Sequence, residues 1–122
     1  YRFRTPSLRN VALTGPYGHN GAYASLEDMV RHHLNPRESF EAWNPDNLIL
    51  PEVPWLAHVD FLSFEDRLER ARLSAQLDIE PKTLSDGEID QLLSFLSALT
   101  GEASIQGRLG RPSAVPSGLP ID

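Results

Sequence analysis

The chain has 122 residues, of which 40% are apolar and 23% are charged, and this length and composition suit one small folded domain. Its formal net charge of −6 disfavours binding to nucleic acid or an anionic membrane surface, since both require a basic face, and no apolar run approaches the roughly 20 residues that cross a bilayer. The absence of cysteine excludes disulfides, thiolate metal sites and the C-x-x-C-H haem attachment motif from this chain.

The first 24 residues are rich in Gly and Pro and predict a loop, with one helical turn around Leu8–Val11. Gly15, Gly18 and Gly21 lie in the stretch TGPYGHNG, where glycine permits positive φ angles and close backbone approach. Such a turn can present carbonyl oxygens to a hard cation such as calcium, although an ordinary tight loop explains the pattern more simply. The chain starts at Tyr1 with no recognisable signal peptide, and we expect it to be part of a longer polypeptide.

A helix is predicted to begin after Ser25, a good N-cap residue, and to end at Asn35, which precedes a proline. Acidic residues occupy its first turn, and apolar residues recur at helical spacing (Leu26, Met29, Val30 and Leu34). His33 falls on this apolar face, whereas His32 points about 100° away and lies near its edge. From spacing alone, each histidine is more simply a structural residue than a ligand.

Residues 35–62 carry four prolines together with Trp43 and Trp55. This pattern predicts a long irregular segment that packs over the core, and long loops of this kind are often functional.

Two further helices are predicted after this segment. The first runs from Ser63 to Leu77, where Ser63 and Asp66 resemble a capping box. The second begins at a capping box of Ser85 and Glu88, has an apolar stripe, and ends at Gly101 as its C′ glycine; the stripe comprises Ile89, Leu92, Leu93, Leu96 and Leu99. The Gly- and Pro-rich tail from residue 102 to 122 is expected to be disordered or an extended strap. The predicted class is mainly α, with about three main helices and long loops.

A family resemblance joins these features. The stretch FRTPSLRNVALTGPYGHNG (Phe3–Gly21), followed by SLEDMV (Ser25–Val30), closely resembles the C-terminal haem domain of bacterial di-haem cytochrome c peroxidases and MauG-like proteins. LSDGEIDQLLSFLSALTG (Leu84–Gly101) resembles the last helix of that family, and VPSGLPID resembles its closing tail. The resemblance implies a cytochrome c-like haem domain fragment over residues 1–101 and an extended tail over residues 102–122.

The resemblance also implies cofactors and their positions. Haem c would be attached through C-x-x-C-H motifs outside this chain, in a protein whose N-terminal haem domain is also missing here. The residue fourteen places after the histidine of P-Y-x-H is the distal iron ligand in the family, and this position is His33, where the family has methionine or tyrosine. Met29, one turn earlier, is the rival ligand. The family also binds calcium through backbone carbonyls that correspond to Thr14 and Pro16.

Further residues receive weaker assignments from the resemblance. Arg4 and Arg9 can pair with haem propionates, because guanidinium and carboxylate match in a bidentate way, although surface arginines explain them almost as well. His19 is expected near the haem, and His58 receives no role. No catalytic residue of the peroxide-binding haem is expected within this chain.

The function implied is that of a periplasmic di-haem peroxidase, in which electrons pass between two c-type haems. It would reduce hydrogen peroxide, or use it to oxidise a partner protein, and a small redox protein would donate electrons. One alternative is a haem-free interaction or scaffold domain, which the lack of cysteine would suit. Another is a zinc or iron hydrolase using His19, His32 or His33, which the absence of an H-x-x-x-H or H-x-x-E-H pair disfavours.

Overall fold

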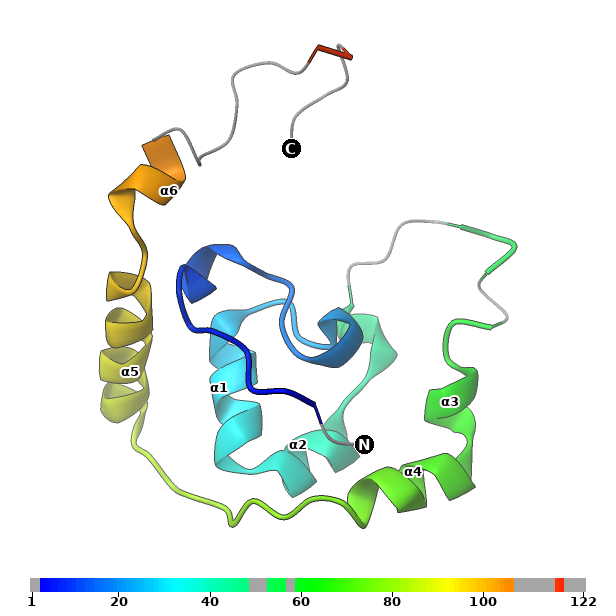
Figure 1. The fold of residues 1–122 in the computed structure, drawn as a ribbon. Helices are drawn as coiled ribbons and strands as arrows, with labels where there is room; N and C mark the ends of the chain where they lie inside the picture. Colours follow the sequence, from blue (N-terminus) through cyan, green and yellow to red (C-terminus); the bar gives the residue numbers. More distant parts are fainter. Residues whose placement is uncertain (1–2, 49–52, 57–58, 107–115, 118–122) are drawn as a thin grey trace.

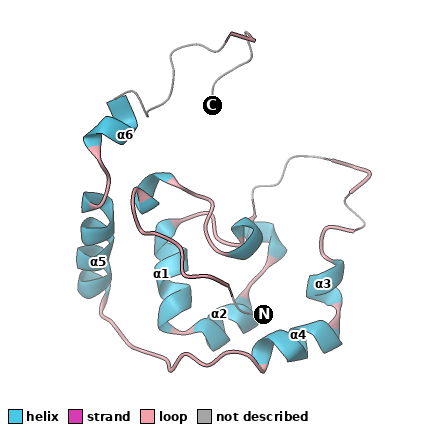
Figure 2. Cartoon of the chain, viewed as in Figure 1, coloured by secondary structure: helices cyan, strands magenta, loops and turns pink. Residues whose placement is uncertain are grey.

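The computed structural model describes residues 3–48, 53–56, 59–106 and 116–117, and these residues are mainly helical (Figures 1 and 2). The α-helices are α1 (Leu26–Leu34), α2 (Pro36–Ala42), α3 (Leu62–Glu65), α4 (Arg67–Ser74), α5 (Asp86–Ala98) and α6 (Glu102–Gln106). Three short 3₁₀ turns are η1 (Val11–Leu13), η2 (His19–Gly21) and η3 (Pro45–Asn47). Within the described residues no strand forms beyond an isolated antiparallel bridge between Tyr17 and Tyr23. The mainly α prediction is therefore confirmed.

Helix α1 begins and ends where the sequence predicts. The Ser25 side chain accepts a hydrogen bond from the Asp28 backbone N–H at 3.0 Å, and the helix ends at Asn35. The segment after it differs from the prediction, because Pro36 starts helix α2 instead of a long irregular loop. Proline suits the first turn of a helix, where its missing N–H is not needed, and Asn35 caps α2 by accepting from the Glu38 N–H at 3.3 Å.

The helix predicted from Ser63 to Leu77 is divided into α3 and α4 at Asp66. Asp66 has an extended ψ of 105° and its carboxylate accepts from the backbone N–H groups of Leu68 and Glu69, at 2.8 and 3.2 Å. Asp66 is therefore the N-cap of a new helix and not the acidic partner of Ser63 in a capping box. The predicted capping box of Ser63 and Asp66 is wrong. The described helix also ends at Ser74, three residues before Leu77.

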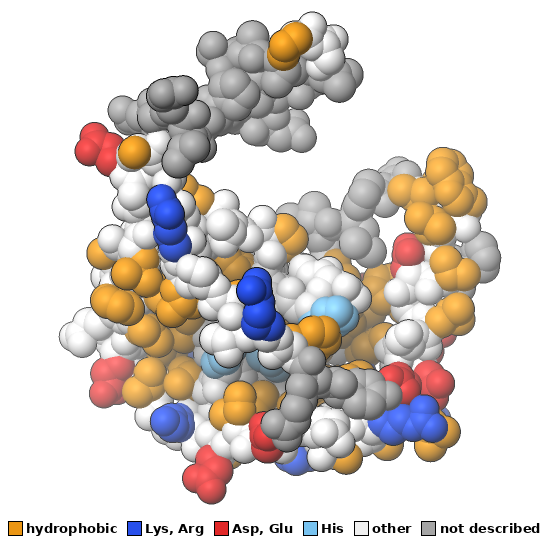
Figure 3. All heavy atoms as spheres, viewed as in Figure 1, with side chains coloured by type: hydrophobic (Ala, Val, Ile, Leu, Met, Phe, Trp, Pro, Cys, Tyr) orange, Lys and Arg blue, Asp and Glu red, His pale blue; other side chains and the backbone are white. Residues whose placement is uncertain are grey.

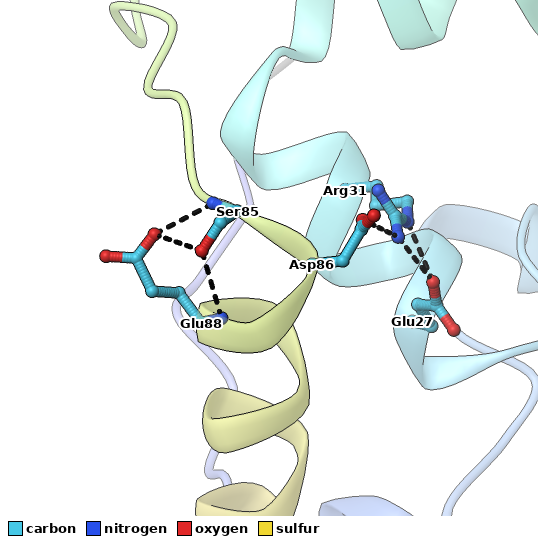
Figure 4. A network of polar contacts seen from close by, with 5 residues as sticks. All are labelled: Glu27, Arg31, Ser85, Asp86 and Glu88. Carbon is cyan, nitrogen blue, oxygen red and sulfur yellow. Dashed lines mark hydrogen bonds and ion pairs between the residues drawn. The ribbon is translucent and has the colours of Figure 1, made fainter.

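Helix α5 has the predicted capping box. Glu88 accepts from the Ser85 backbone N–H at 2.8 Å, and the Ser85 hydroxyl oxygen accepts from the Glu88 N–H at 3.4 Å (Figure 4). The predicted C′ role of Gly101 is wrong, because the helix ends at Ala98 and Gly101 does not have a positive φ. Gly101 instead donates its N–H to the Asn10 side chain at 2.9 Å, which ties the end of α5 to the N-terminal segment.

The core lies between α1 and α5, which run side by side in Figure 1. It consists of Val30 from α1 with Ile89 and Leu96 from α5, which are 8%, 2% and 6% exposed. An ion pair at the surface connects the same helices: Arg31 lies 2.8 Å from Glu27 and 3.1 Å from Asp86 (Figure 4). The predicted apolar stripe of α5 therefore faces α1, and this packing fixes the position of α1.

The α3–α4 unit is joined to α2 by an aromatic cluster. The Arg70 guanidinium stacks over Phe40 and Phe64, at 4.7 and 4.5 Å from the ring centroids, and Trp43 packs edge-on against Phe64 at 5.0 Å. Apolar side chains before and within α3 remain exposed, among them Trp55, Leu56, Val59 and Leu62, and Figure 3 shows apolar side chains gathered on this side of the molecule.

The predicted extended tail begins differently from the expectation, because residues Glu102–Gln106 form the short helix α6. The Asn10 side chain donates to the Ser104 hydroxyl at 3.0 Å and holds this turn against the N-terminal segment. Val115, Leu119 and Ile121, expected within the strap, lie outside the described residues. No helix in the described ranges has the length and apolar character needed to cross a membrane.

Candidate functional site

His33 lies on the last turn of α1 with an exposed side chain. The core-facing stripe of this helix is Leu26, Val30 and Leu34, so His33 lies at the edge of the apolar face and the expectation of an imidazole on that face is corrected. Its Nδ1 is 2.9 Å from the Met29 carbonyl oxygen. Because a carbonyl only accepts, Nδ1 carries the proton, and in the neutral ring Nε2 has a free lone pair. This is the usual arrangement of a metal-ligating histidine, whose second nitrogen donates to a carbonyl or carboxylate.

Met29, the rival ligand, is less exposed than His33. Its sulfur would be 3.4 Å from a β-carbon placed on Gly18, so the thioether packs against the glycine loop. Gly18 has a φ of +78°, which favours glycine. Of the two candidates on this helix, His33 is the more exposed residue.

His32 is half-buried and belongs to a different cluster. Its Nδ1 lies 2.8 Å from the Tyr23 hydroxyl and 3.1 Å from the Ser39 hydroxyl. Burial lowers the pKa of His32, and the neighbouring His33 lowers it further. Burial also raises the pKa of Tyr23. The hydrogen bond with Ser39 lowers this pKa in part, and the negative charge of Asp28 raises it further. The cluster therefore favours a neutral imidazole beside a protonated phenol.

His19 lies in η2 and stacks on Phe3, with ring centroids 4.4 Å apart. The loop around it is closed by backbone hydrogen bonds between Tyr17 and Tyr23, at 2.8 and 3.0 Å. Gly21 is required here, since its φ is +72° and a β-carbon would lie 2.9 Å from Pro16. A tight loop, the simpler of the two explanations, therefore accounts for the glycines at these positions.

Thr14 and Pro16, the residues matched to the calcium site, are both exposed. Neither carbonyl accepts a backbone hydrogen bond from the described residues. Arg4 and Arg9 are exposed as well, and their guanidinium groups form no ion pair with the described part of the chain. His58 lies outside the described residues.

The described residues contain no group of three His, Cys, Asp or Glu side chains that could hold a metal ion. The structure does not bring the predicted histidines together at one point: the rings of His32 and His33 are 5.8 Å apart and nearly perpendicular, and His19 stacks on Phe3 instead. A hydrolytic zinc site requires about three protein ligands, whereas a haem iron bound elsewhere by a proximal histidine requires one from this chain. His33 fits the second requirement.

Sequence reasoning missed the cluster of Tyr23, His32 and Ser39, and a neighbouring hollow of about 360 Å³ that Tyr23, Ser39 and Trp43 help to line. Pro36 is the sequence feature that could have predicted this cluster. It starts a helix directly after α1, and this helix brings Ser39 back beside His32. Trp43 completes this side by donating its indole N–H to the Ala22 carbonyl at 2.8 Å.

Comparison with known proteins finds relatives that are named MauG or cytochrome-c peroxidase. The chain is 36% identical over 101 residues to the methylamine utilization protein MauG of Paracoccus denitrificans, which covers 81% of this chain and 23% of that protein. It is 28% identical over 82 residues to MauG of Methylophilus methylotrophus, covering 67% of this chain and 24% of that protein. A 29-residue stretch is 62% identical to the cytochrome-c peroxidase IdrP1 of Denitromonas iodatirespirans, covering 24% of this chain and 8% of that protein.

The chain thus spans about a quarter of the length of the MauG proteins that it matches. No family model matches the chain. No solved structure matches it either.

Proposed function

The chain belongs to the family of MauG-like di-haem peroxidases, and on this premise we propose that residues 1–101 form the later part of the C-terminal haem domain, followed by a tail over residues 102–122. The N-terminal haem domain and both C-x-x-C-H motifs would come from outside this chain, which has no cysteine. The complete protein would act in the periplasm on hydrogen peroxide, either reducing it or using it to oxidise a partner protein, with electrons from a small redox protein.

The observation that carries the proposal is the state of His33. Its Nδ1–H donates to the Met29 carbonyl at 2.9 Å, so Nε2 is the nitrogen that remains to bind a metal, on an exposed ring. The homologous position in the family holds the distal axial ligand, and the chain offers a nitrogen donor there. We therefore propose that His33 binds haem iron through Nε2, and that Met29 does not.

When bound, haem c supplies one-electron redox chemistry, which the protein adjusts through the axial ligand and its surroundings. His33 would hold the iron from the α1 side. Arg4 and Arg9 would neutralise propionates, and His19 would line the haem surroundings beside Phe3. The Thr14 and Pro16 carbonyls would contribute to a calcium site that other parts of the protein complete.

The identity of the ligand has a measurable consequence. A nitrogen ligand stabilises ferric iron relative to a thioether, so the second haem should have a lower midpoint potential than one with methionine at this position. His33→Met in the complete protein should therefore raise the midpoint potential of one haem and leave the other unchanged, as measured by spectroelectrochemistry.

Turnover gives the functional test. In the complete protein, His33→Ala should slow consumption of hydrogen peroxide by a reduced donor protein, because electron entry through the second haem is altered. His58→Ala, which removes a histidine without an assigned role, is the matched control. If both variants keep the wild-type rate and His33→Met leaves both potentials unchanged, the proposed role of this domain is wrong.

A further inference from the structure

Three polar side chains from three parts of the chain meet beside the proposed ligand. The Tyr23 hydroxyl lies 2.8 Å from both His32 Nδ1 and the Ser39 hydroxyl, and His32 Nδ1 lies 3.1 Å from the Ser39 hydroxyl. Tyr23 precedes α1, His32 belongs to α1 and Ser39 belongs to α2. All three side chains are partly buried. Each polar atom therefore has two partners, and both hydroxyls contact the His32 ring at Nδ1.

The His32 ring in turn contacts its neighbour. The rings of His32 and His33 are 5.8 Å apart at an interplanar angle of 85°, so one ring presents its edge to the other. The His32 ring also packs against Tyr23, with centroids 5.0 Å apart. A continuous line of contacts thus runs from the two hydroxyls through His32 to His33.

Among the described residues, the ring of His33 has one hydrogen bond, from Nδ1 to the Met29 carbonyl. A single bond at one ring nitrogen leaves rotation about the axis of that bond open, and this rotation would turn the plane of the ring. The edge-type contact with the His32 ring places a second side chain against the His33 ring, and a neighbour in contact hinders such rotation. The orientation of a ligating imidazole is commonly fixed by outer partners of this kind.

We propose that Tyr23 and Ser39 are positioning residues, which act through His32 to fix the plane of the His33 ring as an axial ligand. This inference rests on the proposed ligation by His33. It assigns a use to a cluster that would otherwise only join α1 to α2 and to the segment before α1.

The test uses the complete haem-loaded protein and the electron paramagnetic resonance (EPR) spectrum of its ferric low-spin haem, whose g values depend on the orientation of the axial imidazole plane. Tyr23→Phe and Ser39→Ala each remove one hydroxyl. We expect each variant to replace the single set of g values of this haem by a shifted set or by two overlapping sets. Ser39→Thr retains the hydroxyl and should restore the wild-type spectrum.

Tyr17→Phe is the matched control. Tyr17 pairs with Tyr23 across the same backbone bridge, but its hydroxyl donates to the Val11 carbonyl at 2.9 Å and does not touch a histidine. It should loosen the loop without changing the g values. A shift in Tyr17→Phe equal to that in Tyr23→Phe would show a general loosening of the loop and would overturn the inference.

Unchanged g values in both Tyr23→Phe and Ser39→Ala would refute the positioning role. The ligation itself is tested separately: if His33→Ala kept the wild-type low-spin signal, the proposed function would fail, whatever the Tyr23 variant shows.

Discussion

Ile89→Ala should destabilise the chain strongly, because Ile89 is the most buried side chain of the α1–α5 core. It is 2% exposed and clusters with Val30 and Leu96. The substitution removes three methylene-sized groups, which at about 0.8 kcal/mol each contribute about 2.4 kcal/mol of lost transfer free energy. The cavity that remains raises the expected loss to about 3 kcal/mol, within the usual range for this substitution.

The assay is urea unfolding followed by circular dichroism at 222 nm, with Phe95→Ala as the control on the same helix. Phe95 is 57% exposed and lies outside the core cluster, so its removal should cost less than about 1 kcal/mol although its side chain is larger. If Phe95→Ala proved as destabilising as Ile89→Ala, the apolar face of α5 would not pack on α1 as described. The placement of His33 would then lose its support.

Two further predictions concern the capping box and the aromatic cluster. The hydrogen bonds from Ser85 lower the pKa of Glu88 below its ordinary 4.5. The stabilisation by Glu88 should therefore be complete above pH 4.5 and disappear as the pH falls through the folded-state pKa. In urea unfolding, Glu88→Gln should have a lower free energy of unfolding than wild type at pH 7, and this difference should vanish in acid. Arg70→Lys should lower the free energy of unfolding by about 1 kcal/mol, because an ammonium group cannot stack on Phe40 and Phe64 as a planar guanidinium does. Arg67 is exposed, so an equal loss in Arg67→Lys would contradict this prediction.

The elements that sequence predicted well are those with a complete local signal. Ser25 before α1 and the Ser85–Glu88 pair before α5 are capping residues followed by apolar residues at helical spacing, and both helices begin there. The role of His33 follows from the family resemblance and stays a prediction. Local chemistry was sufficient at both helix starts.

The differences arise where one residue type serves two purposes. Pro36 can end one helix or start the next, and here it does both through Asn35. Asp66 can complete a capping box or cap a new helix, and its extended ψ of 105° decides for the second.

The site required tertiary information for a similar reason. Spacing placed His33 on the apolar face of its helix, but only the packing of α5 shows that this face centres on Val30 and leaves His33 at its edge. The hydrogen bond between the His33 ring and the Met29 carbonyl depends on a side-chain rotamer that no sequence pattern specifies. The contacts of Ser39 with Tyr23 and His32 depend on the unpredicted helix α2.

The most direct test of the account is the spin state of the second ferric haem in His33→Ala, measured by EPR spectroscopy on the complete protein. We predict that its low-spin signal is lost and returns when free imidazole is added, because the substitution removes only the Nε2 donor. A low-spin signal that persists in His33→Ala without added imidazole would contradict the account.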